Sequence, residues 1–170
     1  MLRLERDADW QRIGGRLLVP IHDELLAEVP IQYAKEGGEI LSRCMCEAAN
    51  FLPFPITCDV TTTYRWYGIE LESVESFDKP ESLDNLTESN IKWIQAMIYE
   101  NEYLLPVYPN EDGSKPRGDA ALGVNGIWSE ELQSHINDYK SRYQIKSDSE
   151  FIDHIERKVT SGVIGISNQN

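Results

Sequence analysis

The residues with the clearest capacity for chemistry are three consecutive polar side chains, His22, Asp23 and Glu24. They separate two short apolar runs, Leu17–Ile21 and Leu25–Val29, whose lengths suit strands better than helices. Two such runs joined by a short polar connection predict a β-hairpin with the three polar residues at its tip. Carboxylates held by stiff strands present oxygen ligands to a hard cation such as Mg²⁺. The alternative is a solvated turn, because polar residues are common in turns.

Other elements are predicted to position this hairpin. Residues Leu4–Ile13 favour a short helix that ends at Gly14-Gly15, a typical C-terminal cap. Residues 31–52 alternate apolar and polar side chains at helical spacing and predict an amphipathic helix. The pair Gly37-Gly38 lies inside it; since glycine costs a helix about 1 kcal/mol relative to alanine, we expect close packing there on a neighbouring backbone. Residues 56–66 are rich in Thr, Val, Tyr and Trp and predict a last strand.

The rest of the chain is predicted to be mostly helical. Residues 70–86 are rich in Glu, Ser, Asp and Pro and are expected to form an acidic linker. Three helices are then expected, with N-caps at Asn85 or Thr87, at Ser129 and at Ser147. The predicted fold class is α+β: an antiparallel hairpin and a C-terminal strand packed with one helix, followed by a mostly helical extension. The predicted divisions are residues 1–69, 70–86 and 87–165.

Composition and charge restrict the function. The chain has 170 residues and a formal net charge of −13, which argues against an autonomous nucleic-acid-binding module, because such modules neutralise phosphates with Lys and Arg. Its three cysteines, Cys44, Cys46 and Cys58, lack the spacing of a zinc site, so reduced thiols are expected. No signal peptide or membrane span is apparent, and a cytoplasmic location with no membrane partner is expected.

The hairpin sequence resembles motif C of the family A, DNA polymerase I-like, DNA polymerases. In that motif an apolar strand leads into His-Asp-Glu, and a second apolar strand ends in an acidic residue, as in Leu17–Glu28. The resemblance continues through the helix of residues 31–52 and the segment Thr57–Thr61. It ends at Arg65-Trp66-Tyr67-Gly68, which is similar to the C-terminal end of phage and prophage members. About 60 residues resemble the family, roughly residues 9–68.

This resemblance implies a role for each residue at the tip. Asp23 would match the second palm aspartate that holds the catalytic metals, and Glu24 would be the adjacent carboxylate near those metals. His22 would lie close to the primer 3′ end. The implied cofactor is Mg²⁺ in the complete enzyme, and the implied partners are primer-template DNA and deoxynucleoside triphosphates. The implied location is the cytoplasm of a bacterium or a phage-infected cell.

Two other parts of the family pattern have no counterpart in this sequence. Nothing resembles the first metal-binding aspartate or the fingers helix that binds the incoming triphosphate. We therefore expect a C-terminal palm fragment that is inactive alone and needs the missing N-terminal polymerase portion. Whether the chain is itself an enzyme stays open. A non-catalytic binding or remnant module with an acidic helical tail is the alternative, and a small nuclease using Asp23, Glu24 and Asp59 is a third possibility.

Overall fold

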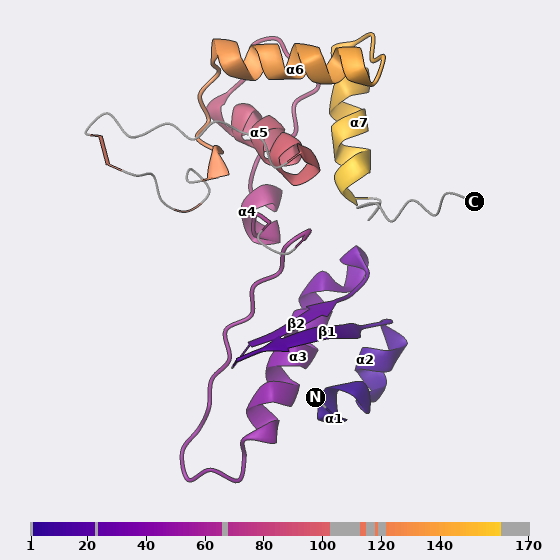
Figure 1. Ribbon diagram of the computed structural model, residues 1–170, viewed down its shortest axis with the longest axis vertical. Coiled ribbons are helices and arrows are strands. Elements are labelled where there is room, and N and C mark those ends of the chain that lie inside the picture. The colour runs from indigo at the N-terminus through magenta and orange to yellow at the C-terminus, as the bar shows by residue number, and fades with distance from the viewer. Residues whose placement is uncertain are drawn as a thin grey trace. The chain divides into compact units, whose positions relative to one another are not determined.

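The computed structural model describes residues 2–22, 24–65, 68–102, 113–114, 118 and 122–160. The chain divides into two compact units, unit 1 (Met1–Thr62) and unit 2 (Thr63–Asn170). Both contain helices, and the strands of the described residues form one two-stranded antiparallel sheet in unit 1 (Figure 1). The α+β fold class predicted from the sequence is therefore confirmed.

Unit 1 is a β-hairpin packed on one long helix. Its elements are α1 (Leu2–Glu5), α2 (Ala8–Arg12), β1 (Arg16–Ile21), β2 (Glu24–Glu28), the 3₁₀ helix η1 (Ile31–Tyr33) and α3 (Ala34–Ala48). Gly14 follows α2 with a φ of 72°, so it is the left-handed C-terminal residue that the sequence predicted. The expected single helix over Leu4–Ile13 is divided in two, because the Asp7 carboxylate accepts from the N–H groups of Asp9 and Trp10 and starts a new helix.

The core of unit 1 lies between the hairpin and α3. Buried side chains from α1, α2 and α3 form it, and the paired strand residues Leu17 and Ala27 pack against them. The buried members are Leu4, Trp10, Ile13, Ile40 and Cys44. Gly37 allows this close packing, since a Cβ there would lie 2.8 Å from Cγ1 of Val29. The predicted close approach is real, but the neighbour is a side chain rather than a backbone.

The last strand expected over residues 56–66 is a wrong prediction. Residues 56–62 contain no helix or strand, and Thr63 forms only an isolated bridge with Glu70. Thr, Val and Tyr favour a strand only when a neighbouring strand completes its hydrogen bonds. Here residues 58–62 lie along α3 instead, where Ser42 Oγ donates to the carbonyl oxygen of Cys58 at 3.4 Å.

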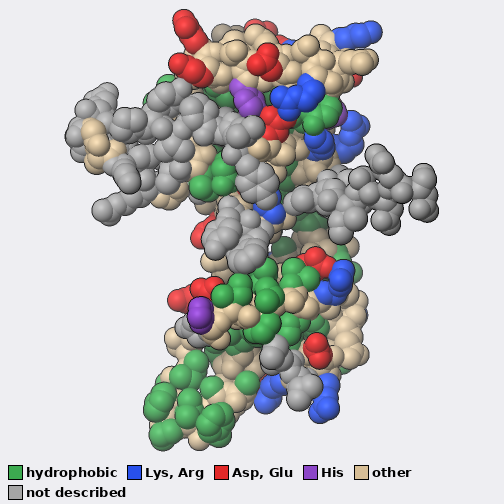
Figure 2. Space-filling model, in the orientation of Figure 1, with side chains coloured by type: hydrophobic (Ala, Val, Ile, Leu, Met, Phe, Trp, Pro, Cys, Tyr) green, Lys and Arg blue, Asp and Glu red, His purple; other side chains and the backbone are tan. Residues whose placement is uncertain are grey.

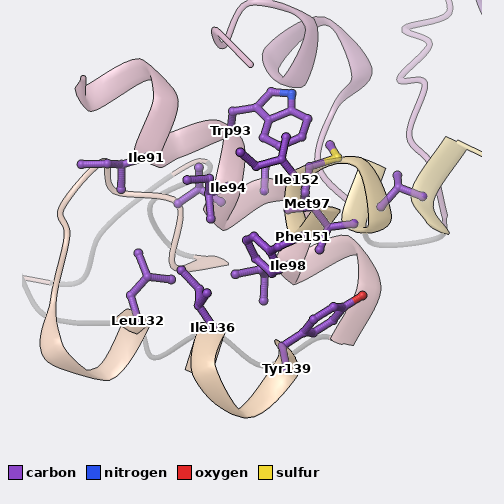
Figure 3. Packing of buried hydrophobic residues seen from close by; sticks show 14 of the residues in the cluster. Ile91, Trp93, Ile94, Met97, Ile98, Leu132, Ile136, Tyr139, Phe151 and Ile152 are labelled. Atoms are coloured by element: carbon purple, nitrogen blue, oxygen red, sulfur yellow. The ribbon is translucent and has the colours of Figure 1, made fainter. Parts of the chain in front are cut away.

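Unit 2 is a helical bundle built by α4 (Leu71–Glu75), α5 (Glu88–Glu102), α6 (Glu130–Arg142) and α7 (Asp148–Thr160). Its core joins the predicted apolar stripes of α5, α6 and α7, as Figure 3 shows. The predicted caps also form: Asn90 N donates to Thr87 Oγ1, Leu132 N to Ser129 Oγ, and Glu150 N to Ser147 Oγ. Tyr143, the residue that caps the C-terminal end of α6, is 36% exposed.

The structure places the division of the chain earlier than composition suggested. The units separate between Thr62 and Thr63 rather than at residue 69. Residues 71–75, which lie in the expected acidic linker of residues 70–86, form α4 and bury Leu71 and Val74. Two apolar side chains three positions apart on a single helical turn provide this burial despite the acidic surroundings.

Candidate functional site

The hairpin tip is the candidate site, and its strand register positions it. The strands pair Arg16 with Glu28, Leu17 with Ala27, Val19 with Leu26, Pro20 with Leu25 and Ile21 with Glu24. The last pair leaves His22 and Asp23 as the connection between the strands. Asp23 lies outside the described residues, so its predicted role stays a prediction.

The backbone at the tip has a special conformation. His22 has a φ of 54°, in the left-handed region that non-glycine residues seldom adopt. Tight two-residue hairpin turns require positive φ, because only these turns match the twist of the paired strands. The side chains of His22 and Glu24, which come directly before and after Asp23 in the sequence, are both exposed. The fold therefore presents both predicted residues to an approaching ligand.

A pocket of about 220 Å³ lies beside the tip, within unit 1. The hairpin contributes His22, Glu24 and Leu25 to its lining. Helices α1 and α3 supply the remaining lining residues, Leu4, Leu41, Cys44, Met45 and Ala48. The pocket is therefore mostly apolar, with an imidazole and a carboxylate on its hairpin side.

The described residues do not assemble a metal centre by themselves. Among them, no three His, Cys, Asp or Glu side chains lie close enough together to hold an ion. His22, Glu24 and Asp59 are all described, so these three do not form a cluster. Asp59, which the third possibility places in a nuclease site, is exposed. A divalent cation at the tip would need Asp23, Glu24 and ligands from other parts of a larger protein.

Arg65 takes part in a buried ion pair that the sequence reasoning missed. Its Nε donates to Glu100 Oε2 of α5 at 2.8 Å, and its Nη2 donates to the carbonyl oxygen of Tyr99 at 2.7 Å. The backbone N–H of Ile69 donates to the other carboxylate oxygen of Glu100 at 2.6 Å. A glutamate within the otherwise apolar face of α5 was the available signal. Trp66 and Tyr67, which continue the family-like segment, lie outside the described residues.

Burial controls the acidity of this carboxylate. The apolar surroundings raise the pKa of Glu100, while the Ile69 N–H and the Arg65 guanidinium act in the opposite direction. Arg65 and Ile69 are therefore both held on α5 within unit 2. They do not continue a strand from unit 1.

Three known proteins show similarity to part of this chain. DNA polymerase I A, chloroplastic, and DNA polymerase I B, mitochondrial, both from Oryza sativa subsp. japonica, are each 34% identical to it over 71 residues. DNA polymerase I A, chloroplastic/mitochondrial, from Arabidopsis thaliana is 31% identical over 71 residues. The matched segment is 40% of this chain but only 7% of each relative's length.

The remaining comparisons found no match. No protein-family model matches the chain, and no solved structure matches it. Among the described helices, none combines the length and the apolar character that crossing a bilayer requires. Part of the chain is thus similar to DNA polymerase I of plant organelles, consistent with the family A resemblance of the hairpin sequence.

Proposed function

We propose that unit 1 is the C-terminal part of the palm of a family A DNA polymerase of phage type. Two observations together support this: a sequence match to DNA polymerase I enzymes and a hairpin whose tip carries His22, Asp23 and Glu24. In this proposal, Asp23 and Glu24 face the catalytic magnesium ions, and His22 lies near the primer 3′ end. The complete enzyme would add deoxynucleotides to primer-template DNA.

The tip residues fit part of a magnesium site. The Glu24 carboxylate is exposed beside the turn, and carboxylate oxygens are the protein ligands that Mg²⁺ prefers. Bound magnesium would supply activation of the primer hydroxyl and stabilisation of the leaving pyrophosphate. The contribution of this chain would be positioning, because the paired strands and the left-handed His22 hold the carboxylate in a fixed place.

Unit 1 alone is proposed to be inactive. Its tip offers one acidic pair, and the resemblance contains neither the first metal-binding aspartate nor the triphosphate-binding helix. The remaining palm, the fingers and the thumb would come from the rest of a longer chain or from a separate polypeptide. Primer-template DNA and nucleotides would then be bound by the complete enzyme, which also accounts for the acidity of this chain.

The hairpin surface supports the need for a larger assembly. Leu17 and Ala27 pack toward α3, whereas Val19 and Leu26 pair beyond a bulge in β1, which places Leu26, the neighbour of Ala27, on the opposite face of the sheet. Val19 is 37% exposed and the unpaired Leu18 is 48% exposed, so apolar side chains of β1 are uncovered within unit 1. Strands that are apolar on both faces are typical of sheets covered on both sides. Figure 2 shows hydrophobic side chains gathered over this unit.

A chimaeric polymerase tests the proposal. Residues 9–68 of this chain replace the segment of the rice chloroplast DNA polymerase I A that resembles them. We expect Mg²⁺-dependent primer extension by the chimaera, and a loss of about 1000-fold or more with Asp23→Asn, because charge positioning supplies much of the rate in such reactions. Glu39→Gln is the matched control: it removes an exposed acid of α3, outside the hairpin, and activity should stay within about 3-fold of that of the chimaera, as expected for a surface change.

Two results would contradict the proposal. One is a folded chimaera, with an unchanged melting temperature, that extends no primer. The other is equal extension by the chimaera and its Asp23→Asn variant. Either result would favour the alternative, a non-catalytic binding or remnant module whose helical unit 2 serves as an acidic tail. The isolated chain, assayed in parallel, should show no extension.

A further inference from the structure

Residues 58–62 pack along one face of α3, and their chain direction is antiparallel to that of the helix. Gly38, Ser42 and Cys46 are spaced four apart, so they form one stripe along α3. A Cβ at Gly38 would lie 3.2 Å from Cγ1 of Val60 and 3.6 Å from Cγ2 of Thr62. One turn further along, Ser42 Oγ donates to the carbonyl oxygen of Cys58.

The same alignment brings two thiols together. Cys46 lies one turn beyond Ser42 on the stripe, and Ser42 itself bonds the Cys58 backbone, so the Cys46 and Cys58 thiols are neighbours that affect each other's ionisation. Both cysteines are free and only partly buried, so small reagents can reach them. Cys44 differs: it is 3% exposed, belongs to the core of unit 1, and has its Sγ 3.8 Å from Oδ2 of Asp7. Two positions along a helix separate Cys44 from Cys46 by about 200° around the axis.

We propose that Cys46 and Cys58 form a thiol pair that oxidises reversibly to an intrachain disulfide, which would tie residues 56–62 to α3. A disulfide needs a sulfur–sulfur bond of about 2.05 Å, and neighbouring thiols on two packed segments can reach it through rotations of their side chains. The pair joins two segments of unit 1 and does not depend on the proposed polymerase function.

The oxidant in this proposal is a low-molecular-weight disulfide such as oxidised glutathione. One cysteine thiolate attacks a glutathione sulfur, forms a mixed disulfide and releases one glutathione thiolate. The second cysteine thiolate then attacks the protein sulfur of the mixed disulfide and releases the second glutathione. Two protein thiols are thus oxidised, two glutathione molecules are formed, and each released thiolate takes up the proton that a protein thiol lost.

The surroundings of Cys58 affect the rate. Burial, followed by the neighbouring Cys46, raises the pKa of the Cys58 thiol, so less of it is ionised at neutral pH. Because the thiolate is the attacking species, disulfide formation should accelerate as the pH rises above neutral. The bond would close a loop that contains Phe51 and Phe54, which are 83% and 57% exposed. Loop closure should raise the melting temperature of unit 1 by roughly 5–10 °C.

The test is mass spectrometry of the whole chain after incubation with oxidised glutathione. All three cysteines lie in one tryptic stretch, residues 44–65, so a glutamate-specific protease that cleaves after Glu47 is added. We expect a cross-link between Cys46 and Cys58 and a mass lower by two hydrogens, both reversed by a reductant. The Cys44→Ser variant should form this cross-link equally well, whereas Cys46→Ser and Cys58→Ser should each retain a glutathione adduct.

Two outcomes would overturn the proposal. The first is glutathione adducts that persist on both Cys46 and Cys58 without a cross-link. The second is a cross-link that requires Cys44 and disappears in Cys44→Ser. The melting temperatures of the reduced variants, compared with that of the reduced parent chain, show whether each substitution leaves unit 1 folded. These outcomes do not involve primer extension, so they are independent of the polymerase test.

Discussion

Arg65 and Glu100 form an ion pair in which only 4% and 1% of the respective side chains are exposed. Glu100 joins two segments far apart in sequence, because it also accepts the backbone N–H of Ile69. Placing charges away from water is costly, and the cost is offset only while both partners and their hydrogen bonds are present. The pair therefore fixes how the segment that starts unit 2 packs on α5.

Replacement of Glu100 by alanine should destabilise unit 2 strongly. The substitution leaves Arg65 buried without the carboxylate and removes the acceptor of the Ile69 N–H. Breaking a buried pair in this way costs about 3–5 kcal/mol of unfolding free energy, measurable by urea denaturation. Glu88→Ala on the same helix is the control, because that side chain is 70% exposed in its pair with Lys92. Equal midpoints for the two variants would contradict this account.

Unit 1 should lose stability in acid through Asp7. The N–H of Trp10 and then the Arg43 guanidinium lower the pKa of this carboxyl below its usual 3.8. Because its pKa is lowered on folding, the Asp7 carboxyl binds fewer protons in the folded state than in the unfolded state. Its contribution to the stability of unit 1 is therefore fully present above about pH 4, and it is lost as the pH falls through the pKa of Asp7 in the folded state. The measurement is the urea midpoint of unit 1 between pH 2 and 6. Asp7→Asn, which can still cap α2, should make the urea midpoint depend less on pH. If the midpoint of this variant changes with pH as much as that of the parent chain, the role of Asp7 is refuted.

Two adjacent glycines of α3 should respond differently to alanine. A Cβ at Gly37 would meet Cγ1 of Val29 at 2.8 Å and Cγ2 at 3.1 Å, and this β-branched side chain has little freedom to move. Overpacking of about 1–3 kcal/mol should outweigh the gain of about 1 kcal/mol in helix propensity, so Gly37→Ala is destabilising overall. Gly38→Ala, whose nearest neighbour would be 3.2 Å away, is the control and should be nearly neutral. The measurement is the melting temperature of each variant. A Gly37→Ala protein that melts at a higher temperature than the parent chain would contradict the close packing of Gly37 on Val29.

Gln95 should be essential for the loop of residues 124–127. It is 4% exposed on α5, and its side-chain oxygen accepts the N–H groups of Asn125 and Gly126 at 2.9 and 2.8 Å. Its amide nitrogen donates to Asn125 Oδ1 and to the carbonyl oxygen of Ile127.

Removing this side chain leaves several polar groups of the loop without partners. Gln95→Ala should therefore cost about 2–4 kcal/mol of unfolding free energy, since each buried unpaired group costs about 1–3 kcal/mol. Gln133→Ala on α6 is the control, because that side chain donates to Asn137 Oδ1 at the surface. Faster amide hydrogen exchange at residues 124–127 should accompany the loss, and unchanged exchange would argue against this role.

Local signals in the sequence predicted much of the secondary structure. The hairpin follows from two apolar runs around His22-Asp23-Glu24, and Gly14 ends α2 as expected. Thr87, Ser129 and Ser147 each cap the helix that the sequence assigned to them. The caps depend on residues within four positions of each other, and the hairpin joins two runs that are adjacent in the sequence, so the sequence alone contains the physical cause.

The tertiary structure decided what depends on distant partners. Residues 56–62 have strand-forming composition, yet they lie along α3, because hydrogen bonds to a second strand are not provided within the described part of unit 1. Arg65 is held in unit 2 by Glu100 and the Tyr99 carbonyl oxygen, which lie 35 and 34 residues away in sequence. The placement of Cys58 one helical turn from Cys46 likewise arises from the packing of that segment on α3. Periodicity and composition describe one segment at a time, and they cannot specify which surface a segment will find.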